Sequence, residues 1–136
     1  MQIDHLEPGD ELDWLVLHHV FDWKRGITAF GEAPYRMADR EYPQLWPVST
    51  DVGFAWHVVT HARQAGLAID LHAAPDAPHD WRVRFAQPAG VAVEGHGTSV
   101  ALAICRAALH AVKAGLLVKS SRPAPRDASG TGPTPP

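Results

Sequence analysis

Two histidines, His57 and His61, have the spacing in this chain that comes closest to a metal-binding motif. Residues four apart in a helix lie on one face, so two imidazoles placed in this way can hold one zinc ion. The residues between them are Val58, Val59 and Thr60, which leaves out the carboxylate of a His-Glu-x-x-His motif. A catalytic zinc ion normally has three protein ligands. We therefore expect no metal and no other cofactor, and we keep a metal-dependent hydrolase only as an alternative.

A second candidate is the glycine-containing run Gly95-His96-Gly97-Thr98-Ser99, which precedes an expected helix. The N-terminus of a helix presents free backbone N–H groups that attract anions, and glycines let the backbone approach a ligand closely. No lysine follows where a Walker motif has one, and helix capping by Thr98 or Ser99 explains the same residues. Both interpretations stay open: a site for a small anionic ligand at residues 96–99, and an ordinary helix cap.

Charged and aromatic side chains elsewhere in the chain extend this candidate ligand site. Arg82, Arg84 and Arg106 would supply positive charge to an anionic ligand. Tyr42 and Trp46 lie in a stretch without helical or strand periodicity, where aromatic rings can stack on a planar base or contact a partner protein. We add these five residues to the candidate ligand-binding set. The aromatic residues that we expect in the core are Trp23, Trp56 and Trp81.

Asp70 and His72 alternate along an expected strand and therefore share one of its faces. An imidazole beside a carboxylate is suited to acid–base chemistry near neutral pH. Other histidines, such as His96, would have to converge on this pair to build an active site, and the sequence alone does not show convergence. We favour a solvated polar face here.

The composition excludes several classes of protein. Of the 136 residues, 46% are hydrophobic and 20% are charged, which is typical of a globular protein rather than a disordered or fibrous one. The formal net charge is -3, whereas proteins that bind nucleic acid usually carry a basic stripe or a strongly basic domain. We therefore expect no non-specific binding to nucleic acid.

Cysteine content and hydropathy indicate a compartment. Cys105 is the single cysteine, so no disulfide can form within the chain, and its position among apolar residues predicts a buried thiol. We find neither a basic leader followed by an apolar core nor an apolar run of membrane-spanning length. The sequence thus predicts a protein of the cytoplasm.

Three helices follow from apolar residues spaced three and four apart. Asp10 and the run Ser49-Thr50-Asp51 are typical residues for helix N-termini, and Gly66 and Gly115 are typical of helix ends. The last helix is rich in alanine and carries a broad apolar stripe, which predicts close packing against a sheet or another helix. The first helix has an unusually wide apolar sector, which leaves homo-oligomerisation open. The expected helices are residues 10–22, 50–65 and 99–114.

Apolar and polar residues alternate between the second and third helices, which is the signature of half-buried strands. Residues 67–73 and 81–85 alternate most clearly, and a turn at 87–90 leads toward Val91 and Val93. Short connections join antiparallel strands. We therefore predict a three-stranded antiparallel sheet within residues 67–94.

The remaining segments lack periodicity. Residues 24–48 contain several glycines, prolines and aromatic side chains, and we interpret them as one long ordered loop. Residues 119–136 are rich in proline, glycine and serine and have little to bury, so we expect a disordered tail. The chain is thus predicted to form a single domain over residues 1–118.

Three segments in this order resemble one known family. They are Leu-Glu-Pro-Gly-Asp-Glu-Leu-Asp at 6–13 leading to Trp23, Ser-Thr-Asp at 49–51 followed by Trp-His-Val-Val at 56–59, and Ala-Leu-Ala-Ile-Cys-Arg-Ala-Ala-Leu at 101–109. Together they are similar to the phage ABA sandwich domain, a family of small phage and bacterial proteins, over residues 6–113. The segment 24–48 and the tail depart from the family's usual pattern.

This resemblance implies helices packed on both faces of a sheet and a phage or prophage source. It supplies no catalytic residues, because the family has no assigned function. Combined with the helix and strand pattern, it predicts an α+β fold, an αβα sandwich in which a small antiparallel sheet packs with three helices.

Because no catalytic motif is complete, we expect binding rather than catalysis. The expected ligand is a small anionic molecule or a nucleotide of host signalling, held near the turn. The alternative is docking on a host or phage protein through residues 35–46.

Overall fold

The structure is a computed structural model that describes residues 2–25, 35–37, 40–42 and 44–118. The expected tail, residues 119–136, lies outside these ranges. The helices of the described residues are η1 (Ile3–His5), α1 (Asp10–Phe21), α2 (Val52–Gln64) and α3 (Val100–Lys113). The strands are β1 (Lys24–Arg25), β2 (Tyr35–Met37), β3 (Arg40–Tyr42), β4 (Ala68–Ala74), β5 (Ala77–Ala86) and β6 (Ala92–Gly97).

The predicted α+β class, with three α-helices and a three-stranded antiparallel sheet, is confirmed. The strands of the main sheet are ordered β4-β5-β6, and each pairs with the next strand along the chain. Asp51 caps α2 by accepting hydrogen bonds from the backbone N–H groups of Gly53 and Phe54, and Ser99 caps α3. At α1, however, the N-cap residue is Gly9, and the expected cap Asp10 is the first residue of the helix.

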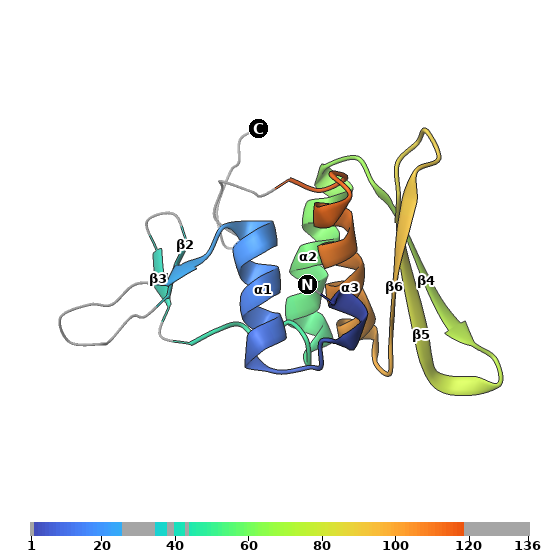
Figure 1. The fold of residues 1–136 in the computed structure, drawn as a ribbon, viewed down its shortest axis with the longest axis horizontal. Helices are drawn as coiled ribbons and strands as arrows, with labels where there is room; N and C mark the ends of the chain where they lie inside the picture. Colours follow the sequence, from blue (N-terminus) through green and yellow to red (C-terminus); the bar gives the residue numbers. More distant parts are fainter. Residues whose placement is uncertain (1, 26–34, 38–39, 43, 119–136) are drawn as a thin grey trace.

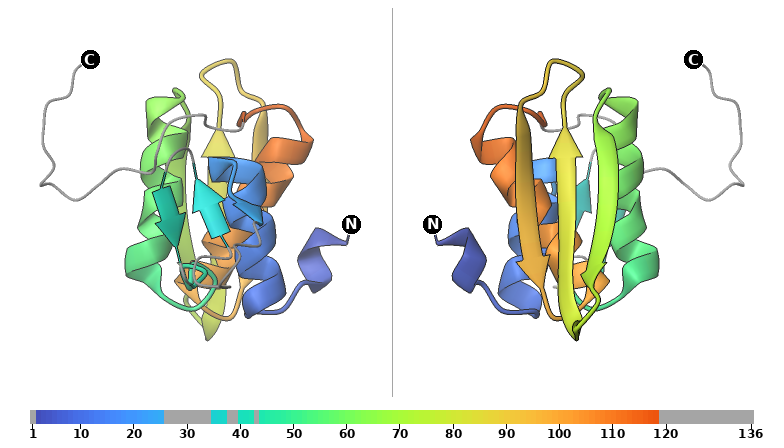
Figure 2. Two further views of the ribbon diagram at one scale, coloured as in Figure 1. Left: turned by 90° about the vertical axis from the view of Figure 1, so that its left-hand side faces the viewer. Right: turned by 90° about the vertical axis from the view of Figure 1, so that its right-hand side faces the viewer.

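The order of the layers differs from what the family resemblance implied. The resemblance implied helices on both faces of the sheet, whereas in the described residues all the helices lie on one face of β4–β6 (Figure 1). α3 contacts β5 and β6, α2 contacts β4, and α1 packs on α3. The right-hand view of Figure 2 shows the other face of this sheet with no helix in front of it. The physical reason is polarity, since this second face carries charged side chains along all three strands.

The contact between α3 and the main sheet is unusually close because two glycines of β6 face the helix. A Cβ atom on Gly95 would overlap the backbone of Ala103 and Ala107, and one on Gly97 would lie 2.8 Å from Cγ of Leu102. Most residues of α3 are buried, many of them alanines, so the helix is narrow on the side that meets the sheet. Small residues on both elements therefore set the spacing between the two layers.

The segment 24–48 was predicted to be one long loop, and the described part of it shows that this is wrong. Residues 24–25, 35–37 and 40–42 form a second antiparallel sheet, β1-β2-β3, on the far side of α1 in Figure 1. Strands of two and three residues are too short to produce a recognisable alternation. Residues 26–34, 38–39 and 43 lie outside the described residues.

The tryptophans divide between core and surface. Trp23 is fully buried, as expected, and Trp81 packs against the core while partly exposed. Trp56 was expected in the core, but 45% of it is exposed. On α2 the buried stripe is formed by residues such as Ala55 and Val59, and Trp56 falls beside this stripe rather than within it.

A buried polar network joins the start of α1 to the segment before α2. The backbone N–H of Ser49 donates to the Asp13 carboxylate at 2.7 Å, and the Gly9 N–H donates to Ser49 Oγ at 2.9 Å. Ser49 is fully buried, and burial raises the pKa of Asp13. This network satisfies polar groups that the core would otherwise leave unpaired. None of the described helices is long and apolar enough to cross a membrane.

We predict that Gly95→Ala destabilises the protein by about 2 kcal/mol or more, since a methyl group forced into a packed contact requires the backbone to move. The measurement is urea unfolding followed by circular dichroism. Thr98→Ala, at an exposed residue directly after β6, is the control and should change stability little. Equal stability of the two variants would contradict the close contact.

A second prediction concerns Asp13. Because its pKa in the folded state is raised above the ordinary 3.8, the folded state binds the proton more tightly than the unfolded state. This contribution to stability is therefore lost as the pH rises from 3.8 through the folded-state pKa. Asp13→Asn should lack this loss. The unfolding temperature of the variant minus that of the wild type should therefore increase as the pH rises. Glu7→Gln, at an exposed carboxylate, is the control, and parallel pH profiles for Asp13→Asn and the wild type would contradict the prediction.

Candidate functional site

The uncovered face of the main sheet carries two rows of polar side chains that run across its strands. In antiparallel sheets, residues directly opposite one another point to the same face. We define the acidic row as Asp70, Arg84 and Glu94, and the basic row as His72, Arg82 and His96. The residues between them in sequence point to the other face, where Val83 is fully buried. The alternation of each strand thus separates a charged face from an apolar one.

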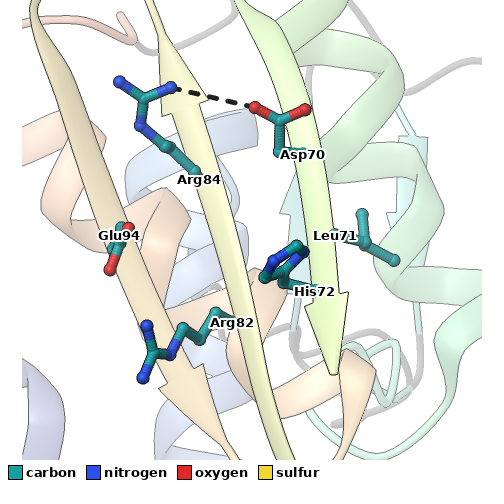
Figure 3. A pocket seen from close by; sticks show the side chains of 6 residues that line it. All are labelled: Asp70, Leu71, His72, Arg82, Arg84 and Glu94. Carbon is teal, nitrogen blue, oxygen red and sulfur yellow. Dashed lines mark ion pairs between the residues drawn. The ribbon is translucent and has the colours of Figure 1, made fainter. Parts of the chain in front are cut away.

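A shallow pocket of about 420 Å³ lies over this face. Figure 3 shows five polar side chains on its floor and the side chain of Leu71 extending past the outer side of β4. The pocket is lined by Asp70, Leu71, His72, Arg82, Arg84 and Glu94. A ligand placed here would meet both signs of charge.

Ion pairs and hydrogen bonds among the six side chains leave one arginine without a partner in the described residues. Arg84 and Asp70 approach to 3.8 Å, and His96 lies 3.2 Å from Glu94. Arg82 has no hydrogen bond or ion pair within the part of the chain that the structure describes. An arginine presents a rigid fork of N–H donors that matches the oxygens of a carboxylate or a phosphate. Arg82 is therefore the side chain of this face best placed to receive an anion.

The structure separates the residues that were predicted to form one site around the turn. His96 lies opposite Arg82 on the charged face, whereas Gly97 faces α3. Ser99 Oγ accepts a hydrogen bond from the backbone N–H of Leu102 at 3.2 Å, so it acts as a helix cap. Thr98 is exposed at the turn. Of the predicted set, the structure brings together His96, Arg82 and Arg84.

Arg106 lies apart from the other two arginines and holds the N-terminal segment against the fold. Its Nη2 and Nε atoms donate to the carbonyl oxygen of Leu6 at 2.7 and 3.2 Å, and its Nη1 donates to that of His96 at 2.8 Å. Nearby, His110 and Asp4 form a contact of 2.8 Å, and this hydrogen bond lowers the pKa of Asp4. The guanidinium of Arg106 is thus occupied by backbone carbonyls.

Tyr42 and Trp46 belong to an aromatic cluster around the buried Trp23. The Tyr42 ring stacks on Trp23 at 4.6 Å between centroids, and Trp46 meets Trp23 edge-on at 5.4 Å. Both outer rings are half-buried. Nε1 of Trp23 is buried and has no hydrogen-bond partner among the described residues. These contacts assign the two rings a packing role, and docking through residues 35–46 stays a prediction.

The two histidines of the metal hypothesis pack against different rings. His57 lies 5.0 Å from Trp46, and His61 lies 5.6 Å from Phe21 and contacts the carbonyl oxygen of Val118 at 3.2 Å. Within the described ranges, no group of three histidine, cysteine, aspartate or glutamate side chains is arranged to hold a metal ion.

Cys105 is buried, and its thiol donates to the carbonyl oxygen of Val48 at 3.3 Å. Burial strongly raises its pKa, so the nucleophilic thiolate is disfavoured. This residue therefore fits a packing role better than a chemical one.

Sequence reasoning placed Asp70 and His72 on one strand face and identified Arg82 and Arg84 separately. It did not combine them, because strand register is needed to show that Arg84 lies opposite Asp70 and Arg82 opposite His72. The signal that could have combined these four residues is the alternation of polar and apolar residues in both strands of the β4–β5 hairpin.

We predict that Arg106→Met lowers the free energy of unfolding by about 1.5–3 kcal/mol, the usual range for hydrogen bonds from a charged group. The reason is that the carbonyl oxygens of Leu6 and His96 lose their donor. Denaturant unfolding measures the effect, and Arg63→Met, at an exposed arginine of α2, is the matched control. Arg106→Lys should fall between Arg106→Met and the wild type, and identical midpoints for Arg106→Met and Arg63→Met would contradict this role.

Comparison with families of known proteins gives a match over most of the chain. The sequence model described as the phage ABA sandwich domain matches residues 14–109, a span that runs from α1 to α3 and includes both sheets and the charged face. No curated protein and no solved structure matches the chain.

Proposed function

The chain belongs to the phage ABA sandwich domain family, and from this premise we propose that it is an accessory protein of a phage or prophage that binds a small anionic ligand. The ligand class is a nucleotide or a related phosphate ester of host signalling, which the protein would sequester in the host cytoplasm. The site is the charged face of the main sheet. The observation that carries this proposal is that Arg82, in the middle of the basic row, has no partner among the residues that the structure describes.

The basic row suits a phosphate group. Arg82 offers two parallel N–H donors, and charge-assisted bonds of this kind are about twice as strong as neutral ones. His72 and His96 flank it on the neighbouring strands, where opposite side chains stand about 5 Å apart. A phosphate above Arg82 would therefore lie within reach of three donors from three strands.

The acidic row favours a ligand that also carries hydrogen-bond donors. Asp70 and Glu94 would repel a bare anion, but their carboxylates accept hydrogen bonds from hydroxyl and amino groups. A nucleotide combines a phosphate with such groups on its sugar and base. Arg84 is held by Asp70 only at 3.8 Å, so a ligand can compete for it. The two rows thus select a molecule that is anionic at one end and a hydrogen-bond donor at the other.

Binding fits this face better than catalysis. The two rows contain no hydroxyl or thiol that could act as a nucleophile, since their members are arginine, histidine, aspartate and glutamate. The pocket is shallow and open, whereas catalytic sites usually exclude water from the reacting groups. We therefore propose sequestration without turnover as its role.

We predict that titration calorimetry against a panel of mononucleotides, dinucleotides and cyclic nucleotides detects a ligand, and that Arg82→Gln weakens its binding about tenfold or more, or 1.4 kcal/mol. The reason is the loss of the central cation of the basic row. Arg63→Gln removes an exposed arginine from α2 and should bind like the wild type. If the wild type binds no member of the panel, or if both variants lose binding equally, the proposal is wrong.

The same titration tests the two histidines of the basic row. The double variant His72→Ala, His96→Ala should weaken binding while keeping part of the affinity through Arg82, because two of the three donors beside the phosphate are removed. His79→Ala, at an exposed histidine outside the two rows, is the control. An unchanged affinity of the double variant would exclude the two histidines as ligand contacts.

A further inference from the structure

The main sheet has two outer strands, and they differ in how their edges are covered. Along β6, Arg106 donates to the backbone carbonyl of His96, and α3 packs closely on the strand. β4 lies at the other margin, with no strand beyond it in the right-hand view of Figure 2. An edge strand presents unpaired N–H and C=O groups, and proteins commonly protect such edges with lysine, proline or a bulge. β4 contains neither lysine nor proline, and its irregularity lies at its last residues, between Ala73 and Ala74.

We propose that β4 is the interface of a symmetric dimer, in which β4 of a second copy of this chain pairs antiparallel to it about a two-fold axis through Leu71. Such a pairing joins the two three-stranded sheets into one continuous sheet. A two-fold axis makes the interface self-complementary, because each contact occurs twice. This inference goes beyond the proposed ligand site and does not depend on it.

The sequence of β4 is complementary to itself in this register. With Leu71 opposite Leu71 of the second copy, Asp70 stands opposite His72 of that copy, and His72 stands opposite its Asp70. Both side chains lie on the charged face of the sheet, so two carboxylate–imidazole pairs form across the axis. The imidazole can donate its N–H to the carboxylate, and the register places no two carboxylates opposite each other, which would destabilise the pairing. This complementarity favours a second copy over an unrelated strand.

The apolar face of β4 also favours pairing with a second copy of this chain. Leu71 points to the face that the helices cover, yet it is 37% exposed, while its neighbour Val83 on β5 is fully buried. The helix layer therefore leaves part of Leu71 uncovered at this edge. In the proposed register the two Leu71 side chains lie side by side and cover each other. The arrangement removes an exposed leucine from water in both copies.

α2, the helix that contacts β4, also carries exposed apolar side chains. Val52 and Trp56 are 50% and 45% exposed and lie one helical turn apart. Two other residues of α2, His57 and His61, have rings that face Trp46 and Phe21. A second copy added at β4 would therefore lie beside a helix with two exposed apolar side chains.

The first test uses the full chain without ligand. Size-exclusion chromatography with light scattering should give twice the 14.8 kDa mass of one chain. Leu71→Cys should form a disulfide-linked dimer with oxidised glutathione as the oxidant, since opposite residues of antiparallel strands have Cα atoms close enough for a disulfide. Val91→Cys, at another exposed apolar residue, is the matched control. Cys105 is buried and should not take part.

A charge exchange tests the register. His72→Glu places glutamate opposite Asp70 of the second copy and should yield monomers, while the double variant Asp70→Lys, His72→Glu should restore the dimer with two new ion pairs. Circular dichroism checks that each variant is folded. A monomeric wild type, equal crosslinking of the two cysteine variants, or a double variant as monomeric as His72→Glu would each overturn the proposal. Because no ligand is used, these outcomes are separate from the test of the ligand site.

Discussion

The close approach of α3 to the main sheet is the constraint on which the rest of the structure depends. Gly95 and Gly97 place bare backbone against the helix, and Ala103 and Ala107 leave room for it. Neither side can gain a methyl group at these contacts without a backbone shift. The short distance lets the apolar side chains of α3 reach Val83 and its neighbours on β5. It also fixes which face of each strand is buried, because a strand that turns one side chain toward α3 must turn the next one away.

The charged face is the consequence of that assignment. Once the inner residues of β4, β5 and β6 face the helix layer, the alternate residues must point to the other side, where they meet no helix in the described structure. Six charged or titratable side chains on one open face are compatible with folding only because water solvates them. A second helix layer on this face would have to bury these charges, which is costly unless each is paired. The one-sided arrangement of helices and the presence of a polar surface therefore have one cause.

The three arginines illustrate how position decides the role of a side chain. Arg106 extends from α3 to the carbonyl oxygens of Leu6 and His96 and so joins the N-terminal segment to β6 and α3. Arg84 has a loosely placed carboxylate partner, and Arg82 has none within the described residues. The same guanidinium chemistry thus stabilises the fold at one position and leaves donors available at another. That difference, rather than the number of arginines, is what makes the sheet face the candidate binding surface.

The sequence by itself determined the three α-helices, the short runs that contain the N-caps Asp51 and Ser99, and the three strands of the main sheet, because helical spacing, capping and alternation are local properties of the chain. It also carried the family resemblance, which rests on three short segments in a fixed order along the chain. It did not reveal the sheet β1-β2-β3, whose strands are too short for periodicity, nor the exposure of Trp56. Only the tertiary structure decided that Gly97 serves packing and that Arg82 meets no partner in the described ranges, since both facts depend on which distant residues lie near them.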